Sequence, residues 1–335
     1  MALPSGPFAQ LPILLGAALI LIGTSAAEAA RASPREIAAA VVGLRSEVPA
    51  EARTADTLGR QRSGSGVVID DDGLVLTIGY LILEAAAVDL YDEAGKRIPA
   101  DIVAYDHESG LALVRATAPL AAKPLALGRS GEVPVGDPLL VLSRDGAFDG
   151  REVKLASRRE FAGYWEYLLP DALFTTPPHA AWAGAALLDR EGRLVGIGSL
   201  LVGDAVAEEV EAPGNMFVPV DALRPILGDL LALGRRDGPA HPWVGLYARE
   251  HAGHVVIANV ADGGPAETAG LRPGDVVLAV GGNEVDSLSE LYRSIWDLGP
   301  PGVTVPLRVL RQDRVIELDV PSLDRMRWLR LKQSY

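Results

Sequence analysis

From residue 39 to about residue 216, the chain is a series of short β-rich runs separated by glycine, proline and aspartate turns. Short strands at this density are typical of an all-β barrel or sandwich. Hairpin turns are predicted at residues 71–73 and 92–95, where aspartate and glycine interrupt the apolar pattern. The predicted strands are residues 41–44, 66–69, 74–77, 88–91, 98–105, 111–115, 139–143, 185–188 and 194–201.

The apolar period changes after Pro219. Leucine and isoleucine recur at three- and four-residue spacing over residues 221–233, and Gly234 follows as a stop, which predicts a helix. Residues 235–242 are polar and rich in helix breakers, so they predict a linker. We therefore expect a first domain over residues 30–234, a second over residues 243–321 and a basic tail over residues 322–335.

Composition limits the functions that we expect of this chain. Its 335 residues, of which 49% are apolar, are enough for two domains with buried cores. The net charge of -13 opposes binding to a polyanion, so we expect no nucleic-acid partner. The absence of cysteine excludes thiolate catalysis and thiolate zinc sites, and the five histidines lack the spacing of metal ligands. We expect neither a metal nor a cofactor.

The N-terminus predicts export. Residues 11–23 form an apolar run that is short for a membrane span but suits the core of a signal peptide, and residues 27–29 (AEA) offer a cleavage site. A signal peptide over residues 1–29 implies a periplasmic or secreted protein. No lysine or arginine precedes the run, so a retained membrane anchor stays open as an alternative, as does a buried helix of the mature fold.

Two sets of motifs resemble known families. Residues 261–280 (ADGGPAETAGLRPGDVVLAV) closely resemble the signature of bacterial PDZ domains. Residues 63–70 (SGSGVVID), 76–82, 109–114 and 181–187 resemble, in order, four motifs of the HtrA (DegP-like) trypsin-like serine proteases. The resemblance implies a mainly β fold, in which a trypsin-like double β-barrel is followed by one PDZ domain.

The same resemblance implies that the protease triad is degenerate. It places Tyr80 at the general-base position, Gly110 at the position of the orienting aspartate and Ala183 at the nucleophile. Alanine has no oxygen for attack on a carbonyl, a phenol with a pKa of about 10 is a poor base near neutral pH, and glycine has no carboxylate. We therefore expect no catalytic residues at these positions and no protease activity.

A relocated catalytic site is the alternative. His179 and His107 lie close in sequence to the old positions, and Ser109 or Thr175 offers a hydroxyl. No spacing favours any particular pair, so this alternative, a serine endopeptidase of HtrA type with relocated residues, rests on the scaffold alone. A second alternative is a regulatory subunit that assembles with an active HtrA protease.

The PDZ resemblance also implies a peptide-binding groove. PDZ domains add an extended peptide to a sheet edge and hold its terminal carboxylate with backbone amides. Here residues 243–246 (Trp243, Val244, Gly245 and Leu246) resemble the carboxylate loop, and Leu246 and Tyr247 begin the strand that the peptide would extend. The opposite wall is the helix from residue 288, where Leu291 and Ile295 are the preferred pocket residues beside Leu288 and Tyr292. The alternative is that these four residues are core.

These inferences together predict an exported HtrA-like pseudoprotease. It would bind hydrophobic C-termini or unfolded segments through its PDZ domain, as a scaffold, adaptor or chaperone-like factor of protein quality control in the cell envelope. A homo-oligomer stays open. Membrane contact is expected only through a retained N-terminal segment or the basic tail, and the acidic residues 204–211 predict a solvated loop in preference to a docking surface.

Overall fold

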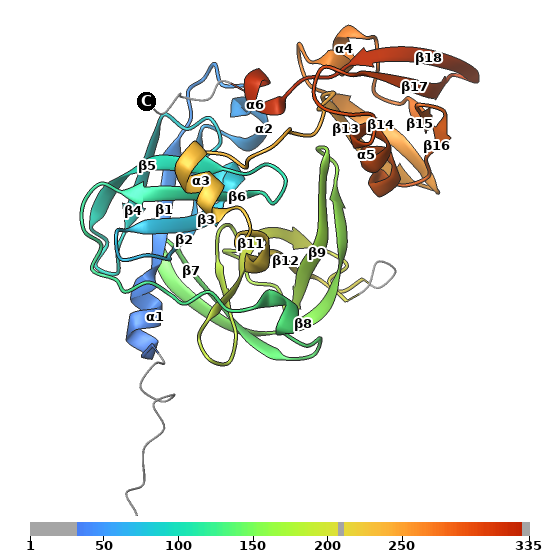
Figure 1. Ribbon diagram of the computed structural model, residues 1–335. Coiled ribbons are helices and arrows are strands. Elements are labelled where there is room, and N and C mark those ends of the chain that lie inside the picture. The colour runs from blue at the N-terminus through green and yellow to red at the C-terminus, as the bar shows by residue number, and fades with distance from the viewer. Residues whose placement is uncertain (1–31, 207–210, 330–335) are drawn as a thin grey trace, which may run out of the picture. The chain divides into compact units, whose positions relative to one another are not determined.

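The computed structural model describes residues 32–206 and 211–329 (Figure 1). The predicted signal peptide, the centre of the acidic loop and the last six residues of the tail lie outside the described residues. Within the described ranges, no helix has both the length and the apolar content to cross a membrane. The residues divide into two closed β-barrels and a third, open sheet, which confirms the expected mainly β fold.

The first barrel starts behind a short helix, α1 (Pro34–Ala40), which Ser33 and Glu36 close at its N-terminus with a capping box. Its strands are hydrogen-bonded in the order β1-β2-β3-β6-β5-β4, with the short helix α2 (Ala55–Leu58) between the first two. Strand β3 is buried along its whole length and lies in the core. The strand bounds are β1 (Val41–Glu47), β2 (Gln61–Val68), β3 (Leu74–Ile78), β4 (Ala87–Tyr91), β5 (Arg97–Tyr105) and β6 (Leu111–Ala116).

The second barrel has the order β10-β11-β12-β9-β8-β7. Its β8 and β9 form one long hairpin that the sequence analysis did not predict. Most side chains of β8 are exposed or half-buried, so the strand has no continuous apolar run to reveal it. The strand bounds are β7 (Pro138–Asp145), β8 (Ala147–Gly163), β9 (Tyr167–Thr176), β10 (Ala186–Leu188), β11 (Leu194–Val202) and β12 (Gly214–Pro219).

The prediction of a helix over residues 221–233 is wrong for the first half of that range. The structure has a 3-10 turn, Val220–Ala222, and then a shorter helix, α3 (Leu227–Leu233). Pro225 explains the break, because proline has no backbone N–H and disfavours helical backbone in the residue before it. The predicted end is correct: Gly234 adopts a left-handed φ of 70° and its N–H donates to the carbonyl of Leu230.

The third sheet follows the order β13-β14-β15-β17-β18, and β16 pairs with β15. Helix α5 packs its buried side chains into the core of this sheet. The described part of the tail folds back, since Leu323 pairs with Trp243 through two backbone hydrogen bonds of 2.9 Å. The bounds are β13 (Leu246–His251), β14 (His254–Val260), α4 (Pro265–Thr268), β15 (Val276–Val280), β16 (Asn283–Glu284), α5 (Leu288–Trp296), β17 (Thr304–Arg311), β18 (Arg314–Pro321) and α6 (Arg325–Trp328).

One buried ion pair anchors this sheet and allows a stability prediction. Arg311 donates two hydrogen bonds of 2.6 Å to Asp275, whose side chain is 1% exposed. Arg311→Met leaves this carboxylate buried without its cation, so we expect a loss of about 3 kcal/mol of unfolding free energy. The control is Arg308→Met, which removes an exposed pair with Glu284 and is expected to cost less than about 1 kcal/mol. Urea unfolding followed by circular dichroism measures both; equal losses would contradict this prediction.

Candidate functional site

The two triad positions of the first barrel, Tyr80 and Gly110, are neighbours in the structure. Tyr80 lies in the 3-10 helix Gly79–Leu81 directly after β3, and the N–H of Gly79 donates to the carbonyl of Gly110 at 2.7 Å. Gly110 has a φ of 76°, a left-handed backbone that favours glycine. A β-carbon there would lie 3.3 Å from the Tyr167 hydroxyl. Tyr167 therefore lies next to the space that a side chain at position 110 would enter.

The third position, Ala183, lies beside the same part of the first barrel. The carbonyl of Ala183 accepts a hydrogen bond of 2.8 Å from the N–H of Ser65. A β-carbon placed on Gly64 would lie 2.5 Å from the Ala183 carbonyl oxygen and 2.7 Å from a methyl group of Leu81. The structure therefore brings the three sequence-predicted positions together where the two barrels meet.

The groups at these positions have little chemistry to offer. The Tyr80 hydroxyl donates to the carbonyl of Ser199 at 2.8 Å, and burial raises the pKa of this phenol well above its usual value. Tyr80 therefore stays protonated near neutral pH and already has a partner for its proton. Gly110 contributes no side chain and Ala183 contributes a methyl group.

Another serine and histidine do form a hydrogen bond in the second barrel domain, between β7 and the loop after β9. Ser143 Oγ lies 2.8 Å from His179 Nε2, and His179 Nδ1 lies 3.8 Å from a carboxylate oxygen of Asp149. Both Ser143 and His179 are buried, with 0% and 1% exposure, and burial lowers the pKa of His179. The Thr175 hydroxyl is buried without a hydrogen-bond partner. A nucleophile has to reach a peptide carbonyl, and the side chains of Ser143 and Thr175 are buried.

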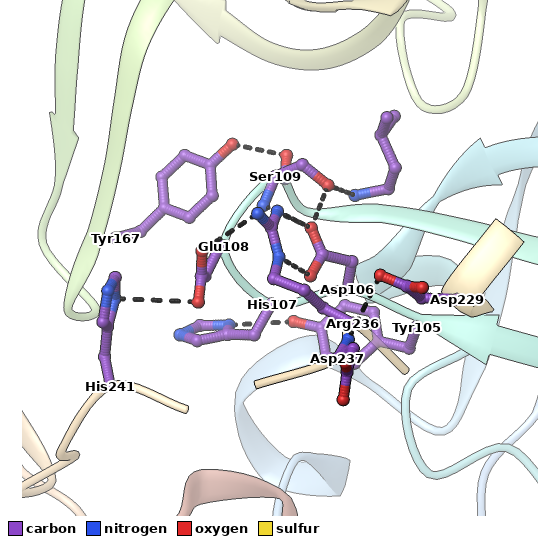
Figure 2. Close-up of polar contacts among 11 residues, drawn as sticks. Tyr105, Asp106, His107, Glu108, Ser109, Tyr167, Asp229, Arg236, Asp237 and His241 are labelled. Carbon is purple, nitrogen blue, oxygen red and sulfur yellow. Dashed lines mark hydrogen bonds and ion pairs between the residues drawn. The ribbon is translucent and has the colours of Figure 1, made fainter. Parts of the chain in front are cut away.

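His107 and Ser109, the other candidates for a relocated site, belong to a cluster that fixes the linker (Figure 2). Ser109 Oγ donates to Asp106 at 2.6 Å, and His107 Nδ1 lies 3.0 Å from the Tyr105 hydroxyl. Arg236 of the linker donates two further hydrogen bonds, of 3.1 and 2.8 Å, to the same Asp106 carboxylate. This carboxylate is therefore occupied by the linker, and the structure does not pair His107 with Ser109.

A cavity of about 380 Å³ lies beside this cluster, where the linker, the loop of residues 105–109 and the first residues of the tail meet. Arg325 of the tail lies on its wall and contacts His107 Nε2 at 2.7 Å. Burial, and then the charge of Arg325, hold the pKa of His107 well below its usual value, so this imidazole is neutral. The linker that the sequence predicted as polar and breaker-rich is thus held to the first barrel by ion pairs.

The predicted carboxylate loop, residues 243–246, does hold a carboxylate. The N–H groups of Val244, Gly245 and Leu246 donate to the side chain of Glu166 at 3.1, 2.7 and 2.9 Å. Glu166 is 3% exposed and lies in the turn between β8 and β9. Three consecutive backbone amides that converge on one carboxylate form the arrangement expected of a site for a peptide terminus.

The rest of the same turn follows the predicted strand edge. We call residues 163–166 the hairpin tip. The N–H of Ala248 in β13 donates to the carbonyl of Tyr164 at 2.9 Å, and the Tyr292 hydroxyl of α5 donates to the carbonyl of Gly163 at 2.7 Å. The hairpin tip is thus hydrogen-bonded to both walls of the predicted groove.

The four predicted side chains of α5 are all buried. Leu288, Leu291, Tyr292 and Ile295 belong to one apolar cluster with Leu246 of β13, and Leu168 of β9 joins this cluster. The pocket role of Leu291 and Ile295 stays a prediction, because the same burial suits core residues. Glu166 was not predicted. The available signal was the group of aromatic residues over positions 161–167, which surrounds this one acidic residue in the turn between β8 and β9.

The backbone conformation of Glu166 and the burial of its carboxyl group are both energetically unfavourable. Its backbone φ of 56° lies in the left-handed region that non-glycine residues rarely adopt. Burial raises the pKa of its carboxyl from 4.5 to about 7, although the three amides and Arg325 act in the opposite direction. Tyr247 and Tyr292 also face it, and His107 contacts its backbone.

Comparisons with known proteins agree with this architecture. The sequence profile of the trypsin-like peptidase domain matches residues 64–197, and that of the PDZ domain matches residues 242–321. A probable periplasmic serine endoprotease, DegP-like, from Chlamydia muridarum is 25% identical over 77% of this chain and 53% of its own length. The serine protease Do-like HtrA of Bacillus subtilis is 28% identical over 75% of this chain and 61% of its own length. The chain thus spans about half the length of the DegP-like relative.

Solved structures share the fold. The HtrA-type protease AlgW with a tripeptide has a TM-score of 0.51 and 20% identity, and the match covers 90% of this chain and 98% of that one. The serine endoprotease from Yersinia pestis has a TM-score of 0.51 and 22% identity, over 88% of this chain and 99% of that one. The three chains therefore share an overall fold.

The raised pKa of Glu166 predicts a pH dependence of stability. A carboxyl whose pKa is higher in the folded state contributes stability that is fully present below the unfolded pKa of 4.5 and is lost as pH rises through about 7. Relative to Glu166→Gln, the wild-type chain should therefore lose about 3 kcal/mol of unfolding free energy between pH 4.5 and 7. Urea unfolding at a series of pH values measures this difference. Glu152→Gln, an exposed change on the same hairpin, should show no such pH-dependent difference from the wild type. If the wild type instead gained stability over Glu166→Gln between pH 4.5 and 7, the three amides would outweigh burial.

Proposed function

Because the chain belongs to the HtrA family of trypsin-like serine proteases with a C-terminal PDZ domain, we propose that it acts by binding and without hydrolysis. Its PDZ domain captures peptide C-termini or unfolded segments in loop 243–246 and along β13. The protein then serves as a scaffold, adaptor or chaperone-like factor in protein quality control in the cell envelope.

The observation that carries this proposal is the convergence of three backbone N–H groups on one carboxylate. The amides of Val244, Gly245 and Leu246 bind a carboxylate whatever chain it belongs to, because the donors are backbone groups with no side-chain selectivity. The neighbouring edge of β13 offers the N–H of Ala248 to an extended chain. A peptide that ends in a free carboxylate therefore suits both features at once.

The absence of hydrolysis is proposed from the three positions at the meeting of the barrels. Tyr80, Gly110 and Ala183 supply a buried phenol, no side chain and a methyl group. Loss of a single triad member commonly lowers turnover by about 10⁴ to 10⁶. A scaffold that retains its barrels and its PDZ domain without these groups keeps the capacity to bind.

Two properties of similar proteins support this setting. The AlgW structures hold a tripeptide or a decapeptide, which makes a short peptide a reasonable ligand class for this chain. Several relatives are described as periplasmic, so we propose the same compartment here, with the N-terminal segment as the export signal.

A serine endopeptidase with relocated residues is the second candidate. Membership of a protease family and the hydrogen bond between Ser143 and His179 favour it. The burial of both side chains opposes it, because a substrate could not reach the Ser143 hydroxyl in this structure. Activity assays separate the two candidates.

We expect the purified chain to show neither labelling by a fluorophosphonate probe nor cleavage of fluorescent casein. Ala183→Ser should remain as inactive as the wild type, because the restored hydroxyl has no base at position 80 and no carboxylate at position 110. Gel fluorescence and a plate assay measure the two activities. Labelling that disappears in Ser143→Ala or His179→Ala would establish the relocated protease instead.

Peptide binding is tested most cleanly in Glu166→Gly, which vacates loop 243–246. Glycine accommodates the left-handed backbone at this position, so the turn is expected to keep its shape. Labelled octapeptides that end in valine or leucine should bind this variant, and the same peptides with a C-terminal amide should bind at least tenfold more weakly, since the amide loses the charge-assisted hydrogen bonds. Fluorescence anisotropy measures both; equal binding of acid and amide would refute the proposed site.

A further inference from the structure

We propose that the hairpin tip, residues 163–166, is an internal ligand of the PDZ groove, which an external peptide carboxylate has to displace before it binds. This inference rests on the proposed peptide-binding function and adds its regulation. It assigns to the second barrel a direct part in controlling access to the third sheet.

The hairpin tip reproduces the contacts of a bound chain end. Its carboxylate accepts from the three amides of loop 243–246, and two residues earlier the carbonyl of Tyr164 accepts from the β13 edge at Ala248. One residue before that, the carbonyl of Gly163 accepts from Tyr292 on α5. The segment therefore runs along the groove toward the loop with a carboxylate at its leading end, although this carboxylate is a side chain.

The tip is preformed by its own aromatic residues. A β-carbon on Gly163 would lie 2.8 Å from the indole of Trp165, so glycine is what lets this ring fold back over the chain. Trp165 also stacks on Tyr167, with ring centroids 5.4 Å apart. A turn that is already ordered loses little conformational entropy when it enters the groove.

Further contacts hold the hairpin on the PDZ domain. Glu160 of β8 pairs with Arg293 of α5, and Leu168 of β9 packs in the apolar cluster of the domain. From the tail, Arg325 donates to the carbonyl of Trp165 at 3.3 Å. The occupied groove is thus secured from the hairpin and from the tail.

The tip also carries features that favour its release. The left-handed backbone of Glu166 and the burial of its carboxyl group both raise the free energy of the occupied state. An external α-carboxylate can use the same three amides without the backbone strain at position 166. Because the internal ligand is tethered, its effective concentration is in the millimolar range, so only ligands that bind the free groove well compete with it.

Occupation by a tethered ligand lowers the apparent affinity of every external ligand by the same factor, because only the fraction of molecules with an open groove can bind it. Removal of the Glu166 carboxylate should therefore strengthen peptide binding at least tenfold, because even one charge-assisted hydrogen bond accounts for about that factor. The strengthening is opposite to the loss expected if Glu166 helped to bind the peptide.

The first experiment measures closure without any peptide. In the full chain, hydrogen–deuterium exchange of the amides at residues 244–246 and 248 should be slow, and in Glu166→Gly it should be at least tenfold faster. The matched control is Glu152→Ala, an exposed carboxylate on β8 of the same hairpin, which should leave these rates unchanged. Equal rates in the wild type and in Glu166→Gly would overturn the proposal.

The second experiment measures competition. The probe is a labelled peptide with residues 159–165 of this chain followed by a C-terminal valine, and anisotropy titrations compare the full wild-type chain, Glu166→Gly and Glu152→Ala. We expect Glu166→Gly to bind at least tenfold more tightly than the other two. Binding of equal strength to all three would overturn the internal ligand while the peptide-binding function survives.

The two failures are distinguishable. If no chain binds the probe but Glu166→Gly accelerates amide exchange in loop 243–246, the internal occupation stands and the proposed peptide-binding function falls. If amide exchange in loop 243–246 does not change and no chain binds the probe, both the internal ligand and the peptide-binding function are refuted.

Discussion

The contact between the carboxylate of Glu166 and the three amides of loop 243–246 connects the parts of this molecule. It joins a turn of the second barrel to the loop that precedes β13. Because the three donors are backbone groups with fixed positions, the hairpin that carries Glu166 also has a fixed place against α5. The tail reaches the same point through Arg325, which contacts Trp165 and His107.

The hairpin that carries Glu166 also contacts the first barrel. In the second barrel, β8 and β9 position Glu166 at one end of their turn and Tyr167 directly after it. Tyr167 donates to the carbonyl of Ser109 at 2.8 Å and fills the space beside Gly110. One hairpin thus contributes both to the contact with loop 243–246 and to the packing around Gly110.

Local sequence signals predicted much of this fold because turns and apolar runs are local properties. The strands of the first barrel and the helix of the PDZ domain follow such signals, whereas β8 is too polar and Pro225 interrupts a regular leucine pattern. Loop 243–246 was predicted from a family resemblance, yet its occupant was not. Glu166 lies 78, 79 and 80 residues away in sequence from its three donors, and no local pattern encodes such a contact.

The most direct test of this account is the backbone amide resonances of residues 244–246 in isotopically labelled Glu166→Gly. On addition of an octapeptide with a free C-terminal carboxylate, the account predicts that these three resonances move toward their wild-type positions, while the C-terminal amide of the same peptide leaves them unchanged. The contradicting result is that the carboxylate peptide leaves these resonances unmoved, or that acid and amide move them alike.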